Sequence, residues 1–405
     1  MRVLIWTQFF WPENFFINSV SRDLARELGG VTVLTGKPNY PQGRFFNGYQ
    51  GFGFSKEKYF GCNVYRIPVI ARGNKSLVGL LLSYLSFIFS GYFFAPFLLK
   101  NEKFDHVFVF ASSPLLQALP AVYIAWRKNA KLVIWVQDIW PDVLTSVGFA
   151  NRKWLIKLVG LFVNYIYHNS SLILIQSEGF RESIEARLRD KNKIHYLPNS
   201  VEILHPNSAP NPLPFGLLDD LSKQFSIVFA GNIGRAQSCG TIIEAAKLLQ
   251  SNCDIKIFLI GDGSQSSFIR DQIERFKLTN IVMTGFIHPA LMPSVYSASS
   301  ALLLTLSDNL ALSSTVPSKL QSYLHAGKPI IASINGDAAE IIISANAGFV
   351  CPAEKPDQLA SLICDLHRMP PSNRAALGIN AQKFFDSHFG VSATTRRIIE
   401  YFSNL

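Results

Sequence analysis

Two short loops in the second half of the chain combine residue types that suit phosphate binding. The first, Phe229-Ala-Gly-Asn-Ile-Gly-Arg235, follows an apolar run and precedes a helical pattern. Glycines at a strand-to-helix junction let backbone N–H groups approach a phosphate, and the helix dipole favours an anion there. Arg235 would add a planar cation to the same oxygens. The candidate contacts are Gly231, Asn232, Gly234 and Arg235. A plain tight turn is the alternative, since the spacing matches neither the dinucleotide nor the Walker pattern.

The second loop is Val316-Pro-Ser-Lys319. Pro317 suits the first turn of a helix, so Ser318 and Lys319 would present a hydroxyl and an ammonium group at its positive end. A solvated lysine at a helix start is the alternative, but two anion-binding loops in one domain favour a clamp for a diphosphate. Negative charge develops on a diphosphate as its bond to a sugar breaks, and Arg235 with Lys319 could stabilise that charge in place of a metal. Without an Asp-x-Asp pair in the sequence, we predict neither a metal nor another cofactor.

Two acidic residues in the first half are further candidates. Asp138 follows the apolar run Leu132–Val136, which places it at the carboxyl edge of a sheet, where ligands of such folds bind. It could position an acceptor hydroxyl or stabilise positive charge on a sugar. It could equally cap the turn before Trp140-Pro141. Glu13, next to Pro12, has the same two interpretations.

Short apolar runs alternate with helical patterns in both halves of the chain, which is typical of doubly wound parallel sheets. A Pro/Asn-rich stretch, Pro206 to Pro214, separates the two series. We therefore predict an α/β protein with two Rossmann-like domains, 1–200 and 201–390. A terminal helix in 391–405 could cross back to the first domain. The predicted strands are Val3–Trp6, Val31–Thr35, Val64–Val69, His106–Phe110, Leu132–Val136, Leu172–Gln176, Ser226–Ala230, Lys256–Ile260, Ile281–Thr284, Ala301–Leu306 and Pro329–Ala332.

Composition narrows the possible binding partners and the cellular location of the protein. A formal net charge of +10 indicates a surface that attracts anions, either nucleic acid, anionic lipid or phosphorylated substrates. Nucleic acid would explain the charge but not the paired phosphate loops, so we do not predict a nucleic-acid partner. The five cysteines form no CxxC pair, and the first residues lead straight into a strand rather than into an export signal. We expect a cytoplasmic location.

The charge-free segment 76–99 is long enough to span a bilayer. The predicted strands before and after it belong to one sheet, which could not form across lipid. Plain burial in the core remains open, and we favour a helix that packs on the sheet with one face in the lipid interface. Segment 152–168, basic and aromatic, is either a second docking helix or an ordinary half-buried one.

Further motifs accompany the two phosphate loops. Those in the second half are Gly261-Asp-Gly263, Thr284-Gly-Phe286, Gly327-Lys-Pro329 and Gly336-Asp-Ala-Ala-Glu340. Those in the first half are Pro12-Glu13, Thr35-Gly-Lys-Pro-Asn-Tyr-Pro41, Gln137-Asp-Ile-Trp-Pro-Asp142, Gln176-Ser-Glu-Gly-Phe180 and Leu197-Pro-Asn-Ser200. Over nearly its whole length the chain resembles the family 4 glycosyltransferases of the GT-B fold. It is most similar to the WbuB-like branch, bacterial O-antigen and capsule enzymes that transfer N-acetyl-L-fucosamine or related deoxysugars.

This resemblance implies two Rossmann-like domains facing a cleft, with the donor bound to the second domain and the acceptor to the first. It implies metal-independent, retaining transfer in which Arg235 and Lys319 hold the diphosphate and Asp138 acts on the acceptor side. Phe286 and Ile287 would pack on the nucleotide base, and the turn containing Gly261 and Gly263 would border the same pocket. The donor would be a UDP-sugar.

The sequence departs from the family pattern at two places. Ser314 and Ser322 stand where the family has a pair of glutamates that serve the sugar and the ribose. The glycine-rich first loop of the family is replaced by Pro12-Glu-Asn-Phe-Phe-Ile-Asn18, so Asn14 and Asn18, with Glu13, are the candidates for its contacts.

The positive charge, the two apolar basic segments and the resemblance together predict a prenyl-diphosphate-linked saccharide as acceptor, with the protein peripherally attached to the inner face of the cytoplasmic membrane. Two other functions remain open. A nucleotide-sugar epimerase shares the GT-B fold, and a catalytically silent donor-binding scaffold would fit Ser314 and Ser322.

Overall fold

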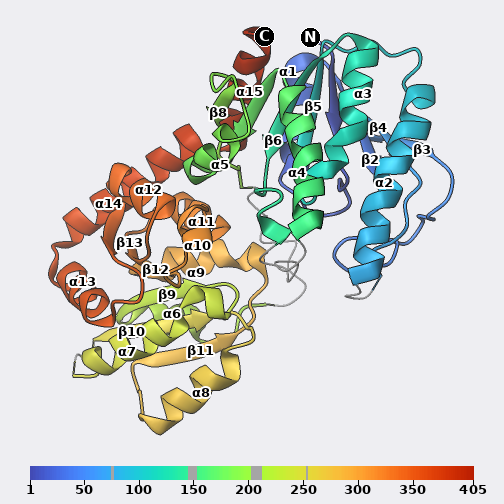
Figure 1. Cartoon of the computed structure of the whole chain (residues 1–405). Coiled ribbons are helices and arrows are strands. Elements are labelled where there is room, and N and C mark those ends of the chain that lie inside the picture. The colour runs from blue at the N-terminus through green and yellow to red at the C-terminus, as the bar shows by residue number, and fades with distance from the viewer. Residues whose placement is uncertain (74–76, 145–152, 202–211, 252–253) are drawn as a thin grey trace. The chain divides into compact units, whose positions relative to one another are not determined.

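The chain forms two compact α/β units in the computed structural model, which describes residues 1–73, 77–144, 153–201, 212–251 and 254–405. The first unit contains Met1–Ser200 together with Val391–Leu405, and the second contains Val201–Gly390. Each unit has its own sheet with helices on both faces (Figure 1). Residues 206–211 of the predicted Pro/Asn-rich stretch, Pro206 to Pro214, lie outside the described residues.

The sheet of the first unit has eight strands in the order β3-β4-β2-β1-β5-β6-β7-β8. All neighbours pair in parallel except β3 and β4. The strands are β1 Val3–Trp6, β2 Val31–Gly36, β3 Ser55–Tyr59, β4 Cys62–Ile67, β5 His106–Ala111, β6 Lys131–Val136, β7 Leu172–Ile175 and β8 Ile194–Tyr196. The helices are α1 Ile17–Leu28, α2 Leu77–Leu98, α3 Leu119–Lys128, α4 Lys153–His168, α5 Arg181–Glu185 and α15 Val391–Ser403, with short 3₁₀ turns at Leu115–Ala118 and Glu178–Phe180.

Alternation along β1 explains how this sheet is covered. Leu4 and Trp6 belong to a core shared with α2, α3 and α4, whereas Val3 and Ile5 belong to a core shared with α1 and α15. Successive side chains of a strand point to opposite faces, so a strand buried on both faces reads as a continuous apolar run. The terminal helix α15 packs against α1 as part of the first unit.

The antiparallel hairpin of β3 and β4 was not predicted. β3 reads Ser-Lys-Glu-Lys-Tyr, which has little apolar character because it is an edge strand. Phe60 and Gly61 connect the two strands and both have positive φ, +40° and +85°. Positive φ at both central residues is what a two-residue hairpin requires. The predicted strand Val64–Val69 consequently begins and ends two residues earlier, at Cys62–Ile67.

The sheet of the second unit has six parallel strands in the order β11-β10-β9-β12-β13-β14. The strands are β9 Phe225–Ala230, β10 Ile255–Ile260, β11 Ile281–Gly285, β12 Ala301–Thr305, β13 Ile330–Ser333 and β14 Gly348–Cys351. The helices are α6 Leu217–Ser222, α7 Cys239–Leu249, α8 Ser266–Arg275, α9 Met292–Ala298, α10 Leu310–Ser313, α11 Ser318–Ala326, α12 Asp337–Ser344, α13 Pro356–Arg368 and α14 Pro371–His388, with 3₁₀ turns at Arg235–Gln237 and Pro289–Leu291.

The strand order of this sheet reverses between β9 and β12. Ligands of doubly wound folds bind at the carboxyl ends of the strands around such a reversal. Gly231 follows β9 and Gly261 follows β10, so the fold brings the first predicted phosphate loop and the Gly261 turn to this edge.

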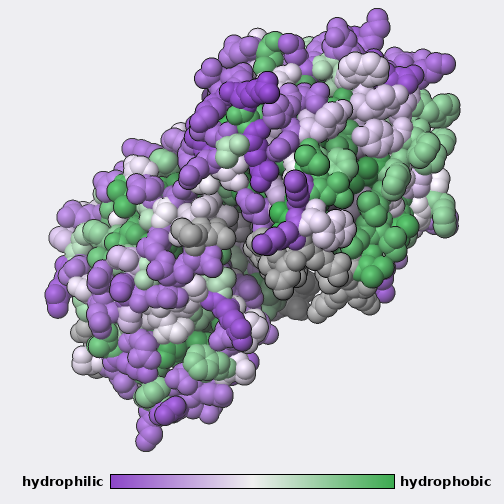
Figure 2. Space-filling view, viewed as in Figure 1, coloured by the Kyte–Doolittle hydropathy of each residue, from purple (hydrophilic) through white to green (hydrophobic). Residues whose placement is uncertain are grey.

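Helix α2 packs on the first sheet with one side only. Phe87, Ala95 and Ser83 are buried, whereas an apolar stripe faces outward. We call this stripe the α2 apolar face; it consists of Leu81, Leu85, Phe89, Phe93 and Phe97, of which Phe93 is 76% exposed. Figure 2 shows apolar residues gathered over α2. Ser76, the first residue of the predicted segment, lies outside the described residues.

By length and composition Val78–Leu98 could cross a membrane, and it is the one such helix in the described part of the chain. The strands on either side of it, β4 and β5, belong to the same sheet. Both ends of α2 must therefore lie on one side of any bilayer, because backbone pairing cannot continue across lipid. Helix α4 also exposes an apolar stripe, which includes Trp154, Leu158 and Leu161. Arg152 of the predicted segment lies outside the described residues.

Candidate functional site

A cavity of about 480 Å³ opens at the carboxyl ends of β9, β10 and β11 and against the start of α11. Seven of the predicted donor-binding residues line it: Gly231, Asn232, Gly261, Phe286, Ile287, Ser318 and Lys319. We call it the donor pocket. The structure thus joins loops that are up to about ninety residues apart in the sequence. The remaining predicted residues Gly234, Arg235, Gly263 and Pro317 are not among its lining residues.

Lys319 is the cation of the donor pocket. Its ammonium nitrogen donates to Gln237 Oε1 at 2.5 Å and lies 3.9 Å from the centroid of the Phe229 ring. Burial lowers the pKa of Lys319 to about 8. A desolvated ammonium whose direct contacts are an amide oxygen and a ring face can gain considerably from an anion that enters the pocket.

Gly231 lines the donor pocket, but its N–H group is not available to a phosphate. Its N–H continues the sheet by donating to Ile260 O at 2.8 Å, so it is already used. A Cβ at this position would lie 2.5 Å from Lys319 Cε, and φ is +125°. The glycine therefore makes room for the lysine side chain next to β9.

Three further close approaches hold the loops of the donor pocket together. A Cβ on Gly261 would lie 1.9 Å from Gly231 O, and one on Gly263 would lie 2.4 Å from Ile233 O. Ile233 N–H donates to Asp262 O at 3.0 Å. Gly263 and Gly234 are thus packing positions: a Cβ on Gly234 would lie 2.7 Å from Asn232 Nδ2. The backbones of the two loops touch because these positions have no side chain.

The loop after Gly234 also differs from the expectation. Arg235–Gln237 form a 3₁₀ turn, and α7 begins only at Cys239. The positive end of that helix is therefore several residues beyond the glycines. The Arg235 side chain is exposed, while Ser307 Oγ donates to Arg235 O at 2.8 Å and Ser307 N–H donates to Ala236 O at 3.0 Å. These hydrogen bonds hold the backbone at Arg235 in place, whereas its guanidinium group is exposed to solvent.

The start of α11 follows the prediction with a shift of one residue. Pro317 is the capping residue, with extended backbone, and the helix begins at Ser318. Gly327, with φ +63°, ends it as predicted. Ser322 lines the donor pocket and donates from its hydroxyl to Ser318 O at 3.3 Å. Ser314 lies between α10 and α11. Asp262 is the one carboxylate among the described lining residues of this pocket.

Sequence reasoning missed two partners of Lys319, Gln237 and Phe229. Phe229 belongs to the loop that was singled out and Gln237 lies two residues after it, but the prediction was based on the glycines and the arginine of that loop. Gln237 is also held from the other side, because Thr305 Oγ1 donates to Gln237 O at 2.5 Å. The signal available in the sequence was Gln237 itself, a polar residue just after the predicted phosphate loop that could accept a hydrogen bond from the predicted lysine. The pairing of the two depends on how α11 packs against β9.

In the first unit Asp138 lies directly after β6, as predicted, and is half-buried. Burial raises the pKa of its carboxyl group, while a hydrogen bond from Ser113 opposes that rise. Ser113 follows β5, the strand next to β6, and was not predicted. The charge of Asp138 also reaches Tyr84 of α2, whose pKa is raised mainly by burial. Ser113 is therefore a hydrogen-bond partner of Asp138, and Tyr84 lies within reach of its charge.

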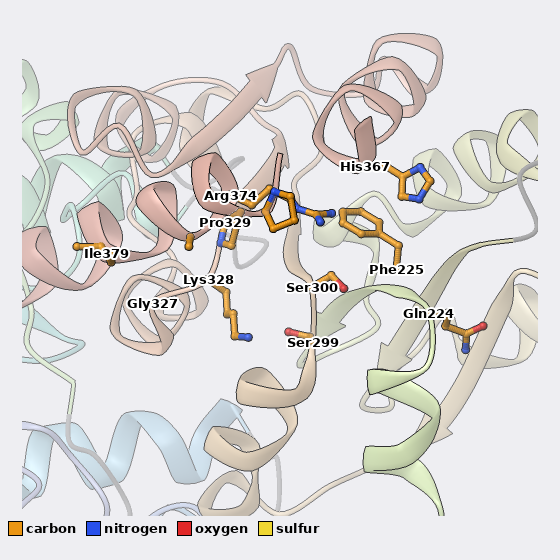
Figure 3. A pocket seen from close by; sticks show the side chains of 12 residues that line it. Gln224, Phe225, Ser299, Ser300, Gly327, Lys328, Pro329, His367, Arg374 and Ile379 are labelled. Atoms are coloured by element: carbon orange, nitrogen blue, oxygen red, sulfur yellow. The ribbon is translucent and has the colours of Figure 1, made fainter. Parts of the chain in front are cut away.

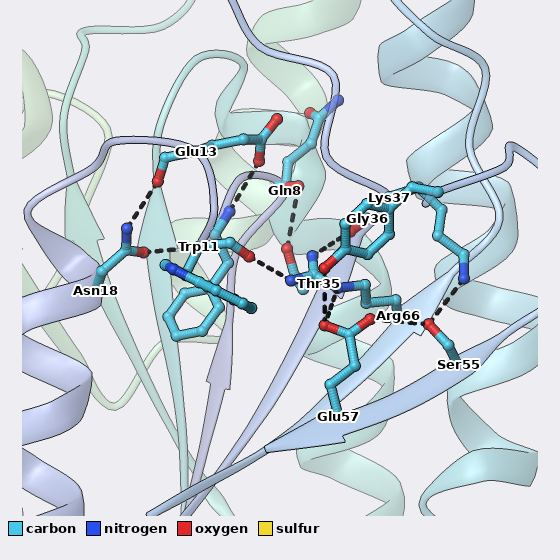
Figure 4. Close-up of polar contacts among 12 residues, drawn as sticks. Gln8, Trp11, Glu13, Asn18, Thr35, Gly36, Lys37, Ser55, Glu57 and Arg66 are labelled. Atoms are coloured by element: carbon cyan, nitrogen blue, oxygen red, sulfur yellow. Dashed lines mark hydrogen bonds and ion pairs between the residues drawn. The ribbon is translucent and has the colours of Figure 1, made fainter. Parts of the chain in front are cut away.

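The side chains of Glu13 and Asn18 bind backbone groups, those of their own loop and, for Glu13, also those of the loop after β2 (Figure 4). The Glu13 carboxylate accepts from the N–H groups of Phe10 at 3.0 Å and of Asn39 and Tyr40 at 2.8 Å each. Burial raises the pKa of Glu13 to about 7 against the effect of these three bonds. Asn18 accepts from Trp11 N–H and donates to Glu13 O. These contacts favour the structural interpretation of Glu13 and extend it to Asn18, whereas Asn14 is exposed.

Arg66 completes this network from β4. Its side chain is fully buried and donates to Glu57 Oε2 at 3.0 Å, to Gly36 O at 3.1 Å and to Trp11 O. Lys37 donates to Ser55 Oγ at 2.8 Å on the neighbouring hairpin strand (Figure 4). A buried guanidinium with several acceptors fixes the loops after β1 and β2 relative to the hairpin. These loops form the carboxyl edge of the sheet near Asp138.

In the described part of the chain no three His, Cys, Asp or Glu side chains gather closely enough to hold a metal ion. Four of the five cysteines, those at 62, 239, 351 and 364, are free thiols.

The chain is similar in sequence and in fold to known proteins. Residues 219–384 match the family model described as Glycosyl transferases group 1. The putative colanic acid biosynthesis glycosyl transferase WcaI of Escherichia coli K12 is 23% identical over 81% of this chain and 82% of its own length. Anabaena Alr3699/HepE, solved in complex with UDP, has a TM-score of 0.65 at 15% identity over the whole of both chains. Escherichia coli trehalose-6-phosphate protein, solved with UDP-2-fluoro glucose, has a TM-score of 0.71 at 12% identity over 100% of this chain and 99% of its own.

The two parallel-sheet α/β domains and these similarities define a protein of the GT-B fold. Most of its second domain, which holds the donor pocket, matches the glycosyl transferases group 1 model.

Proposed function

We propose that this protein is a retaining, metal-independent glycosyltransferase. It transfers a deoxy or N-acetylamino sugar, N-acetyl-L-fucosamine by resemblance, from a UDP-sugar to a prenyl-diphosphate-linked saccharide during bacterial O-antigen or capsule biosynthesis. The observation that carries the proposal is the desolvated Lys319 in a cavity formed by Gly231, Gly261 and the start of α11. That cavity lies within the part of the chain that matches the glycosyltransferase model.

The choice of donor is supported by the similar structures. Alr3699/HepE was solved with UDP, and the trehalose-6-phosphate protein with UDP-2-fluoro glucose. In this chain the exposed Phe286 and the buried Ile287 line one side of the donor pocket and offer an apolar surface to a base. The glutamate pair of the family is absent, so ribose and sugar must bind through other groups. Besides Ser318 and Lys319, the polar side chains on the wall of the pocket are Asn232, Ser322, Asp262 and Tyr296.

The chemistry follows from where charge develops. As the bond between the anomeric carbon and the diphosphate oxygen breaks, the leaving oxygen becomes negative, and Lys319 with the Ser318 hydroxyl at the start of α11 stabilises it. The exposed Arg235 is free to turn toward the same phosphates. The acceptor oxygen forms the new bond on the same face of the sugar, and its proton passes to the leaving phosphate oxygen. Asp138 orients that hydroxyl or stabilises the positive sugar.

Binding to a membrane fits the acceptor. The α2 apolar face and the exposed stripe of α4 lie on helices that cover the same side of the first sheet. The exposed cations Arg127, Lys153 and Lys157 flank them. Aromatic and aliphatic side chains bordered by lysine and arginine are typical of helices that lie in a lipid interface. We place the protein at the inner face of the cytoplasmic membrane, where a prenyl-linked acceptor is held.

The test of the function is release of free nucleotide from a panel of UDP- and GDP-deoxysugars, with and without a prenyl-diphosphate-linked sugar, in buffer containing a metal chelator. Acceptor-dependent release of UDP, with the product keeping the anomeric configuration of the donor, is expected. Isomerisation of donor without acceptor would indicate an epimerase instead. Donor binding without turnover across the panel would indicate the silent scaffold, and inversion would contradict the retaining mechanism.

We predict that replacing Phe93 and Phe97 by serine weakens binding to vesicles of phosphatidylglycerol and phosphatidylcholine by at least about tenfold. Each phenylalanine that enters an apolar phase contributes about 1.5–3 kcal/mol, and both are well exposed in the protein. The measurement is co-sedimentation at low salt. Serine at Phe215 and Phe268, two exposed aromatics of the second unit, is the matched control and should leave binding unchanged. Equal losses in both variants, or none, would contradict docking through α2.

A further inference from the structure

A second cavity, of about 690 Å³, lies at the opposite edge of the second sheet from the donor pocket. It borders the residues that begin or precede β9, β12 and β13, namely Phe225, Ser300 and Pro329, together with the start of α14 (Figure 3). Its volume is within the range of about 300–1,000 Å³ that holds small molecules. Nothing in the reaction proposed above uses it.

The charged groups of this cavity are all of one kind. The cations Lys328 and Arg374 line it beside the His367 ring, and no carboxylate is among its described lining residues. Lys328 is half-buried, and burial lowers its pKa. Its sequence neighbours Gly327 and Pro329 also line the cavity. The half-buried Lys328 ammonium has lost part of its hydration, and an anion in the cavity would relieve that cost.

The arginine is positioned rather than free to move. Its guanidinium carbon lies 5.1 Å from the centroid of the Phe225 ring, and the His367 ring meets the same ring edge-on at 5.0 Å. Phe225 is buried, so it serves as a platform for Arg374 and not as a surface for a base. A guanidinium oriented in this way presents its fork of donors to a phosphate or carboxylate.

A helix dipole and a hydroxyl group also favour an anion in this cavity. Helix α14 begins at Pro371 and runs for eighteen residues, so its positive end adds to Arg374 at the wall of the cavity. The Ser300 hydroxyl oxygen accepts from Ser226 N–H at 3.2 Å, which leaves its own hydrogen able to donate to a ligand. In Figure 3 Lys328 and Ser299 reach into the space below Arg374. Side chains from two loops and a helix thus converge without an acidic partner.

We propose that this cavity binds the phosphate group of a small ligand, either inorganic phosphate or a phosphate monoester, at a site separate from the nucleotide-sugar. Arg374 and Lys328 are its two principal contacts, and His367 and Ser300 complete the set. The site does not depend on the proposed transfer reaction.

The test is isothermal titration of the UDP-saturated protein with inorganic phosphate and, in a second arm, with a hexose phosphate. UDP fills the donor pocket, so phosphate must bind elsewhere. Arg374→Gln and Lys328→Gln should each weaken binding about tenfold or more, as expected when a charged hydrogen-bond donor is removed. The matched controls are Arg368→Gln and Lys383→Gln, exposed cations of α13 and α14. They remove the same charges outside the cavity and should leave binding unchanged.

The two arms separate the ligands, because a hexose phosphate that binds more tightly than phosphate identifies an ester site, and equal affinity identifies a phosphate site. Absence of heat in both arms, or equal weakening by all four variants, would overturn the proposal. If one of the two cavity variants, Arg374→Gln or Lys328→Gln, unfolds at too low a temperature to be measured, the other is sufficient for the test. Failure of UDP itself to bind would count against the glycosyltransferase. In that case, phosphate binding that Arg374→Gln and Lys328→Gln weaken, and that the two control variants leave unchanged, would still support this second site.

Discussion

Replacing Lys319 by methionine is expected to lower kcat/KM about 10²–10³-fold while raising the melting temperature of the protein. The loss follows from removing the cation that faces the developing negative charge of the leaving diphosphate. The gain follows from burial, because lowering the pKa of a lysine from 10.5 to about 8 corresponds to about 3 kcal/mol against its charged form. Methionine keeps most of the apolar stem and has no charge to desolvate. Part of the gain is offset by loss of the contacts with Gln237 and Phe229.

The pH dependence gives this prediction a second readout. Between about pH 8 and 10.5 the unfolded chain keeps the Lys319 proton and the folded protein has lost it, so the unfolded state binds more protons. The stability of the wild type should therefore rise through this range relative to the methionine variant. UDP affinity should fall over the same range, because a neutral amine attracts phosphate weakly.

Thermal unfolding and UDP titration from pH 7 to 10 measure both effects. Lys383→Met, at an exposed position of α14, is the control and should change stability by less than about 0.5 kcal/mol. A methionine variant with near wild-type turnover would remove Lys319 from the proposed mechanism. One that unfolds at lower temperature than the wild type would contradict the burial of an unpaired charge.

Replacing Gly261 by alanine is expected to destabilise the second domain by about 3 kcal/mol or more and to abolish UDP binding. The added Cβ would lie 1.9 Å from Gly231 O, and the backbone has φ +133°, which side-chain-bearing residues rarely adopt. Gly231 cannot move away without breaking its bond to Ile260 O at 2.8 Å. For a domain of this size the loss corresponds to a fall of about 10 °C in melting temperature.

Gly240→Ala is the matched control for this variant. Gly240 lies in helix α7 with open space around its Cα, so alanine there should stabilise the protein by about 0.5–1 kcal/mol. Differential scanning calorimetry of the two variants measures the contrast. Similar melting temperatures for both would mean that the loops after β9 and β10 do not touch in the way described.

Much of the fold was predictable because its strands are buried on both faces. Runs such as Val3–Trp6 and Leu172–Ile175 read as continuous apolar segments, and the ends of the predicted strands differ from the observed ones by at most two residues. The hairpin strand Ser55–Tyr59 escaped notice because an edge strand needs few apolar side chains. The reading of Gly327 as the end of a helix was correct, since a left-handed residue at that point favours glycine.

The site was predictable in its location more than in its detail. Lys319 and Gly231 were expected to meet a phosphate, and the structure brings them to one pocket. The use of Gly231 as space for a lysine stem could not be foreseen, because it depends on how α11 packs against β9. Glu13 shows the opposite case: its acidic type suggested chemistry, whereas three backbone N–H groups occupy it. Sequence spacing alone does not reveal which polar side chains form hydrogen bonds with nearby backbone and are therefore not available to a ligand.

Helix α15 sets the order in which the two domains can be completed. His106 stacks on Phe402 at 4.6 Å, Phe108 meets the same ring at 5.6 Å, and Ile398 is fully buried in the same core. These contacts belong to the first domain, yet residues 391–405 are synthesised after the whole of Val201–Gly390. On the ribosome the second domain can therefore close its core while the first still exposes the face that awaits α15. The first domain therefore completes its core only after helix α15 has been synthesised and has packed on that face.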